Sequence, residues 1–104
     1  MCERRRAPRC VFGGVAEITS IHPNTYVVVS TTELSPFGCF VTTRKTMFIG
    51  TKVELKITHD GRAFKASGEV VSVEAKNGMG IKFTQTAPDD VELLQVWLGQ
   101  DSAF

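Results

Sequence analysis

Residues 51–83 read TKVELKITHDGRAFKASGEVVSVEAKNGMGIKF. At the start of this stretch, Val53, Leu55 and Ile57 alternate with polar residues, which is the period-two pattern of a strand with one buried face. Asp60-Gly61 follows as a hairpin-turn signal. The stretch therefore predicts antiparallel β-structure built from hairpins.

The segment after this turn, residues 62–76, changes phase along its length. Phe64 and the alternate residues after it share one face, whereas Val71 and Val73 fall on the opposite face. A phase change inside one long strand indicates a β-bulge near Val70-Val71, or a strand that bends around a barrel corner.

Asn77-Gly78 predicts a second tight hairpin, because both residues tolerate positive φ. Met79, Ile81 and Phe83 then form the apolar face of a last strand. The strands expected from the whole chain are about 11–21, 26–32, 39–43, 51–58, 62–76 and 79–83. About six antiparallel strands with short turns avoid exposed edges by closing into a small barrel.

A C-terminal helix is predicted over about residues 88–99. Pro88-Asp89-Asp90 is typical of a helix start, where acidic groups meet the positive end of the helix dipole. Val91, Leu94 and Leu98 recur at helical spacing, with Trp97 beside them. One such helix cannot bury its apolar face alone, so it should cap an opening of the sheet. The predicted fold class is all-β with a small α element.

Composition narrows the class of protein. The 104 residues suit one domain, and a formal net charge of +1 gives no support to general nucleic-acid binding. No apolar run reaches the roughly 18 residues of a membrane span, and no secretory signal follows the N-terminus. Cys2, Cys10 and Cys39 are an odd number without paired spacing, so we expect a cytoplasmic protein without a disulfide framework.

Catalytic and metal-binding patterns are weak in this sequence. His22 and His59 fall at predicted turns, and neither has a nucleophile in a recognisable arrangement. The cysteines lack the spacing of a zinc site. We therefore expect neither an enzyme nor a bound metal or cofactor.

The N-terminus carries the densest charge cluster, Arg4-Arg5-Arg6-Ala7-Pro8-Arg9. The planar guanidinium group suits phosphate, because it makes two parallel charge-assisted hydrogen bonds, and it also stacks on flat bases. A solvated basic tail explains the same residues equally well. The pattern by itself leaves both interpretations open.

A turn is predicted at Glu33-Leu34-Ser35-Pro36-Phe37-Gly38. The Ser35 hydroxyl could reach a phosphate or a base edge, and the Glu33 carboxylate could accept hydrogen bonds from a guanine edge. Gly38 would allow backbone to approach a ligand or adopt positive φ. An ordinary hairpin turn is the simpler explanation of this segment alone.

Taken together, the two segments resemble the PilZ domain family, whose pattern is Arg-x-x-x-Arg followed by Asp/Asn-x-Ser-x-x-Gly at a strand turn. The strand Gly78-Met79-Gly80-Ile81-Lys82-Phe83 and the C-terminal helix are similar to that family as well. The resemblance implies a six-stranded antiparallel β-barrel over residues 11–104 and a ligand-binding arm over residues 1–10. It also implies a receptor for cyclic di-GMP.

Carried over by position, the resemblance implies that Arg5 and Arg9 grip phosphates and stack on guanine, with Arg6 adding to that grip. Ser35 and Gly38 would line the pocket. Arg4, just before the motif, is a further candidate and favours a stacked pair of ligands. Glu33 stands where the family has Asp or Asn, which implies an affinity reduced about ten- to a hundredfold rather than abolished.

Three functions remain to be compared. In the first, cyclic di-GMP orders the arm against the barrel, and a downstream protein partner reads the change. The second is a PilZ-like adaptor with weak or no nucleotide binding. The third, a barrel that binds single-stranded nucleic acid, would need exposed stacking aromatics, whereas Phe12, Phe64, Phe83 and Trp97 are expected in the core. We expect no nucleic acid polymer as partner, no membrane insertion, and a monomer or ligand-induced dimer.

Overall fold

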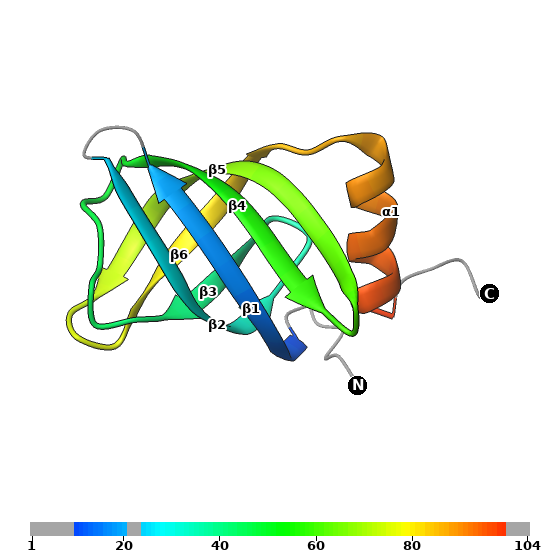
Figure 1. The fold of residues 1–104 in the computed structure, drawn as a ribbon, viewed down its shortest axis with the longest axis horizontal. Coiled ribbons are helices and arrows are strands. Elements are labelled where there is room, and N and C mark those ends of the chain that lie inside the picture. The colour runs from blue at the N-terminus through cyan, green and yellow to red at the C-terminus, as the bar shows by residue number, and fades with distance from the viewer. Residues whose placement is uncertain (1–9, 21–23, 100–104) are drawn as a thin grey trace.

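The structure is a computed structural model that describes residues 10–20 and 24–99. Within these residues, six antiparallel strands close into a barrel and one helix follows (Figure 1). The elements are β1 (Cys10–Ser20), β2 (Thr25–Leu34), β3 (Gly38–Thr42), β4 (Lys52–His59), β5 (Arg62–Glu74), β6 (Gly78–Gln85) and α1 (Pro88–Trp97). The order around the barrel is β1-β2-β3-β6-β5-β4, and β1 pairs with β4 to close it. The predicted fold is confirmed.

Alternating side chains fill the barrel interior, and β4 shows the pattern most clearly. Val53, Leu55 and Ile57 are buried, while the residues between them face solvent. The same alternation in the other strands adds the rest of the core, which includes Ala16, Ile18, Leu34, Val41, Phe64, Val70, Met79 and Ile81. Burying these apolar side chains is the main favourable contribution to folding.

The two predicted hairpins differ in outcome. Asp60 and Gly61 have φ of 56° and 78°, so the expected tight turn between β4 and β5 is confirmed. The second turn is one residue earlier than predicted, because Lys76 holds the positive φ of 65° and Gly78 already begins β6. Gly78 is required for packing, since a Cβ there would collide with the Phe40 ring.

The phase change in β5 is a β-bulge, as expected. The register between β5 and β6 shifts between Val70 and Ser72. Val70 points into the core, whereas Val71 and Ser72 are both exposed on the outer wall. The bulge therefore places two consecutive side chains on the outside of the barrel.

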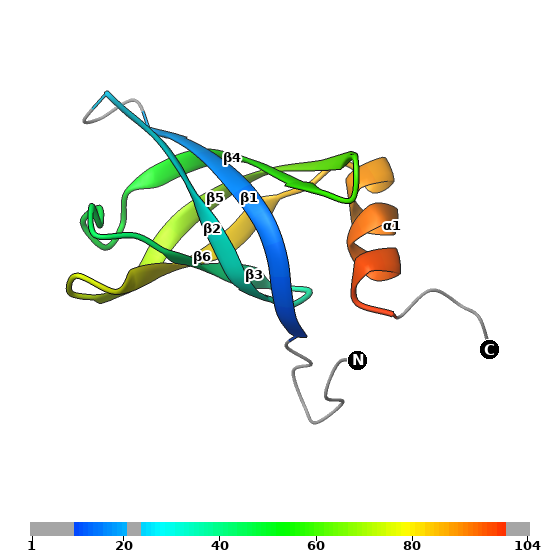
Figure 2. The same cartoon turned by 60° about the horizontal axis from the view of Figure 1, so that its bottom comes forward.

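Helix α1 lies across one end of the barrel (Figures 1 and 2). Its buried side chains are Leu93 and Leu94, and Leu98 just after it is buried as well. Val91, predicted to share this face, is instead 37% exposed, because the apolar stripe runs through Leu93 rather than back to Val91. The Asp90 carboxylate accepts a hydrogen bond from the Lys65 backbone N–H at 3.0 Å, which fixes the helix start to β5.

Candidate functional site

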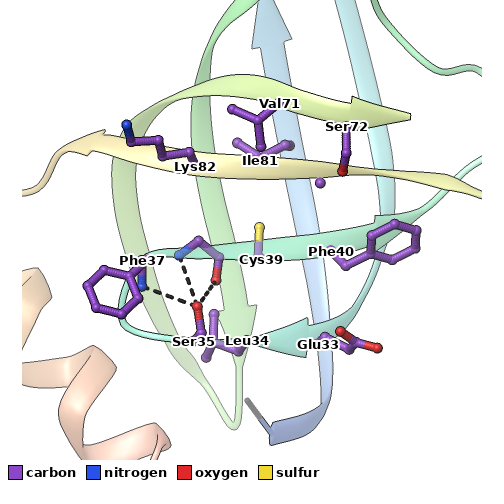
Figure 3. Close-up of a pocket in the computed structure, with 12 residues that line it drawn as sticks. Glu33, Leu34, Ser35, Phe37, Cys39, Phe40, Val71, Ser72, Ile81 and Lys82 are labelled. Carbon is purple, nitrogen blue, oxygen red and sulfur yellow. Dashed lines mark hydrogen bonds between the residues drawn. The ribbon is translucent and has the colours of Figure 1, made fainter. Parts of the chain in front are cut away.

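A pocket of about 270 Å³ opens on the outer wall of the barrel, where β2, β3, β6 and β5 lie side by side (Figure 3). Strand register explains how its residues meet. Glu33 of β2 lies opposite Phe40 of β3, and Phe40 lies opposite Gly80 of β6. Gly80 in turn lies opposite Ser72 at the β5 bulge. These residues form one row across four strands.

The turn between β2 and β3 forms the lower edge of the pocket in Figure 3. The Ser35 hydroxyl accepts hydrogen bonds from the backbone N–H groups of Phe37 and Gly38, both at 3.2 Å. It also donates to the Gly38 carbonyl oxygen at 3.3 Å. Ser35 is buried, so its hydroxyl shapes the turn in the way typical of serine in turns.

Gly38 connects this turn to β6. A Cβ at Gly38 would collide with the Ile81 carbonyl oxygen and lie 3.1 Å from the Lys82 Cα. The glycine is therefore required for close approach of β3 to β6. Its φ is not positive, so the second reason expected from the sequence does not apply.

The pocket has two chemically different ends. Glu33 and Phe40 lie at one end in Figure 3, whereas Phe37 and Lys82 lie at the other. The Phe37 carbonyl oxygen accepts a hydrogen bond from the Phe83 N–H at 2.8 Å, which holds the turn against β6. A carboxylate thus stands at one end and an ammonium group at the other, over a mainly apolar floor.

Cys39 belongs to that floor. It is buried next to the turn, and burial raises the pKa of its thiol from the ordinary 9.0 to about 12. A thiol is therefore present here at neutral pH rather than a reactive thiolate. The floor of the pocket carries no charge from this residue.

The sequence candidates divide into two groups. Glu33, Ser35 and Gly38 line this same pocket, as their proximity in the chain suggested. The arginine candidates, Arg4, Arg5, Arg6 and Arg9, lie outside the described residues, as does His22. His59 sits at the β4 end, where its Nδ1 lies 2.5 Å from the Gly13 carbonyl oxygen and its ring packs edge-on against Trp97.

Sequence reasoning missed Phe40, Ser72 and Lys82 as pocket residues. Two signals in the sequence bear on them: the β5 phase change, which places Ser72 outside, and the outward position of Lys82 in β6. Neither signal says which strands are neighbours. That information comes from the pairing of β6 with both β3 and β5.

In the part of the chain that the structure describes, no cluster of three or more His, Cys, Asp or Glu side chains could hold a metal ion. None of the helical residues described forms a segment long and apolar enough to cross a membrane.

Solved structures of other proteins resemble this barrel. The PilZ domain of YcgR from Escherichia coli, solved with c-di-GMP, has a TM-score of 0.74 and 15% identity, covering 95% of this chain and 92% of that one. The PilZ domain of CeSA from a cellulose-synthesizing bacterium has a TM-score of 0.68 and 17% identity. The match covers 88% of this chain and 95% of that one. At such identities the likeness establishes the fold alone, a small antiparallel β-barrel followed by a helix.

The inhibitor of motility MotI/DgrA of Bacillus subtilis has a TM-score of 0.76 and 16% identity, covering 94% of this chain. The chain spans about half of that protein, 51% of its length. Among curated proteins, no sequence matches. The sequence model of the PilZ domain matches residues 3–100. The chain belongs to the PilZ domain family.

Proposed function

We propose that this protein is a cyclic di-GMP receptor in which the N-terminal arginines close over a nucleotide held on the barrel wall. The observation that carries the proposal is the shared pocket of Glu33, Ser35 and Gly38, in a chain that also has the arginine motif of its family. The barrel offers a carboxylate for a guanine edge, and Arg5 and Arg9 supply the groups that suit phosphates.

In this proposal the arm that precedes β1, residues 1–9, closes over the ligand, and a protein partner recognises the altered surface. Ordering the arm lowers the affinity but generates the signal. Arg6 adds to the phosphate grip, and Arg4 favours a stacked pair of ligands. The protein acts as a receptor and catalyses no reaction.

Calorimetric titration with cyclic di-GMP tests the proposal. Arg5→Ala and Arg9→Ala should each weaken binding at least tenfold, since each removes a charge-assisted hydrogen bond worth about 1.5–3 kcal/mol. Arg44→Ala is the matched control, because Arg44 is exposed beyond β3 and does not line the pocket. Wild-type affinity in both arm variants would contradict the mechanism. The stoichiometry separates one bound ligand from a stacked pair.

A second function, an adaptor with weak or no nucleotide binding, is favoured by one observation. The Ser35 hydroxyl is engaged within its own turn, so this part of the motif has a structural purpose without a ligand. A folded wild-type protein that gives no heat with cyclic di-GMP at high micromolar concentration would support the adaptor and exclude the receptor.

A further inference from the structure

The pocket is small for the ligand proposed above. Pockets that enclose a drug-sized ligand measure about 300–1,000 Å³, whereas this pocket measures about 270 Å³. Cyclic di-GMP contains two purine bases, two sugars and two phosphates, so a large part of it must lie beyond the pocket. The side chains at the rim then decide where the remainder binds.

Phe37 and Lys82 occupy one end of the rim (Figure 3). Phe37 is 66% exposed, although a large aromatic side chain is usually well buried. Its backbone is held on both sides, by the Ser35 hydroxyl at its N–H and by the Phe83 N–H at its carbonyl oxygen. The ring is therefore presented to solvent from a fixed position.

Lys82 adds a cation at the same end of the pocket as this ring. It lies opposite Gly38 of β3 and opposite Glu69 of β5. Across residues 10–20 and 24–99, its ammonium group forms no hydrogen bond or ion pair. Lys82 is exposed and lines the pocket, so its charge is available to an anion bound there.

The separation of the two ends suits a nucleotide. Glu33 and Lys82 are two strand spacings apart and offset by two residues along the strands, which corresponds to about 12 Å between their Cα atoms. A guanine edge and the phosphate of the same nucleotide are also separated, by the base and the sugar. The acidic end can accept from guanine N–H groups, whereas the basic end attracts phosphate.

We infer that Lys82 and Phe37 form a second contact site on the barrel, in which Lys82 binds a phosphate of the ligand and a purine base stacks on Phe37. This inference rests on the proposed receptor function and deepens it. The ligand is oriented along the pocket, with one guanine edge at Glu33, the adjoining phosphate at Lys82 and the other base on the exposed ring. Aromatic stacking contributes to base binding without depending on the arm.

Three variants test the inference by calorimetry with cyclic di-GMP. Phe37→Ala should weaken binding about tenfold, and Lys82→Gln about five- to tenfold, with Lys82→Arg restoring most of the loss. Phe48→Ala and Lys56→Gln are matched controls, because Phe48 and Lys56 are also exposed but lie outside the pocket. The controls should bind as the wild type does.

Fluorescence gives a direct measurement of the stacking. In Phe37→Trp, added cyclic di-GMP should quench the new indole beyond any change from Trp97, whereas Phe48→Trp should respond as the wild type does. If wild-type protein binds but Phe37→Ala and Lys82→Gln retain full affinity, the inference is wrong and the receptor function stands. If the wild type itself gives no binding, both are overturned.

Discussion

Two turns at opposite ends of the barrel both present a phenylalanine to solvent. Phe37 follows β2, and Phe48 lies between β3 and β4, where it is 85% exposed. Each turn is fixed by a hydroxyl: that of Ser35 in the first, and in the second that of Thr51, which donates to the Phe48 carbonyl oxygen at 2.6 Å. Both turns therefore expose an aromatic ring from a backbone that a hydroxyl holds in place.

The surroundings of the two rings differ. Phe37 shares one end of its pocket with Lys82, whereas Glu33 lies at the other end, and the pocket walls come from four strands. Beside Phe48 the neighbours are mainly apolar, with Met47, Ile49 and Val73 lining a pocket of about 530 Å³. An exposed ring by itself specifies no ligand. Polar groups of opposite charge at known positions around it make the first turn a candidate site for a nucleotide.

The largest expected difference between the turns concerns their glycines. Gly38→Ala should lower the free energy of unfolding by about 3 kcal/mol, because its Cβ would force β3 away from β6. Gly50→Ala should lower it by about 1–2 kcal/mol, because Gly50 has open space around it and only its φ of 95° is unfavourable for alanine. Urea denaturation of both variants measures this, and a larger loss for Gly50→Ala would reverse our account.

The hydroxyl groups should differ less. Ser35→Ala leaves two backbone N–H groups without their acceptor and should lower the free energy of unfolding by about 2 kcal/mol. Thr51→Val should lower it by about 1 kcal/mol or less, because the Phe48 carbonyl oxygen still accepts from the Thr51 N–H at 3.0 Å. Thermal unfolding would rank the two variants, and equal losses would show that the first turn is no more dependent on its hydroxyl.

At neutral pH the smallest expected effect on stability comes from ionisation of Cys39, just after the first turn, because this effect appears only at alkaline pH. Its folded-state pKa is raised to about 12 by burial, so its contribution is complete below pH 9 and lost as pH rises from about 9 to 12. In that window stability should fall by about 1.4 kcal/mol per pH unit. The measurement is the free energy of unfolding as a function of pH, for Tyr26→Phe and for the double variant Tyr26→Phe/Cys39→Ala. Tyr26 is replaced in both proteins because a hydrogen bond to Glu17 also raises its pKa. If the stability of both proteins fell equally from pH 9 to 12, Cys39 would not be the cause of the loss.

Local patterns predicted the strands and the β5 bulge well, because each depends on neighbouring residues along one strand. The Asn77-Gly78 turn was placed one residue late because Gly78 is required by contact with Phe40, a residue of another strand. Val91 was placed on the buried helix face because the sequence does not reveal which side of α1 meets the barrel.

In the candidate site, too, residues close together in the chain could be predicted, whereas residues brought together by strand pairing could not. Glu33, Ser35 and Gly38 could be predicted because they share one turn, and they line one pocket. Lys82 and Ser72 join them only through the pairing of β6 with β3 and with β5. Such long-range register cannot be read from a local pattern. The roles of Arg5 and Arg9 stay predictions, because both lie outside the described residues.

The pairing of β3 with β6 has a consequence for the folding reaction. It joins segments far apart in the chain, whereas β2 with β3 and β5 with β6 are neighbours in sequence. Closing long loops is entropically costly, so we expect the local hairpins to form before β3 pairs with β6. The pocket spans the paired strands β3 and β6, so it is complete only in the native barrel. A ligand bound there would therefore slow unfolding by holding the two halves of the barrel together.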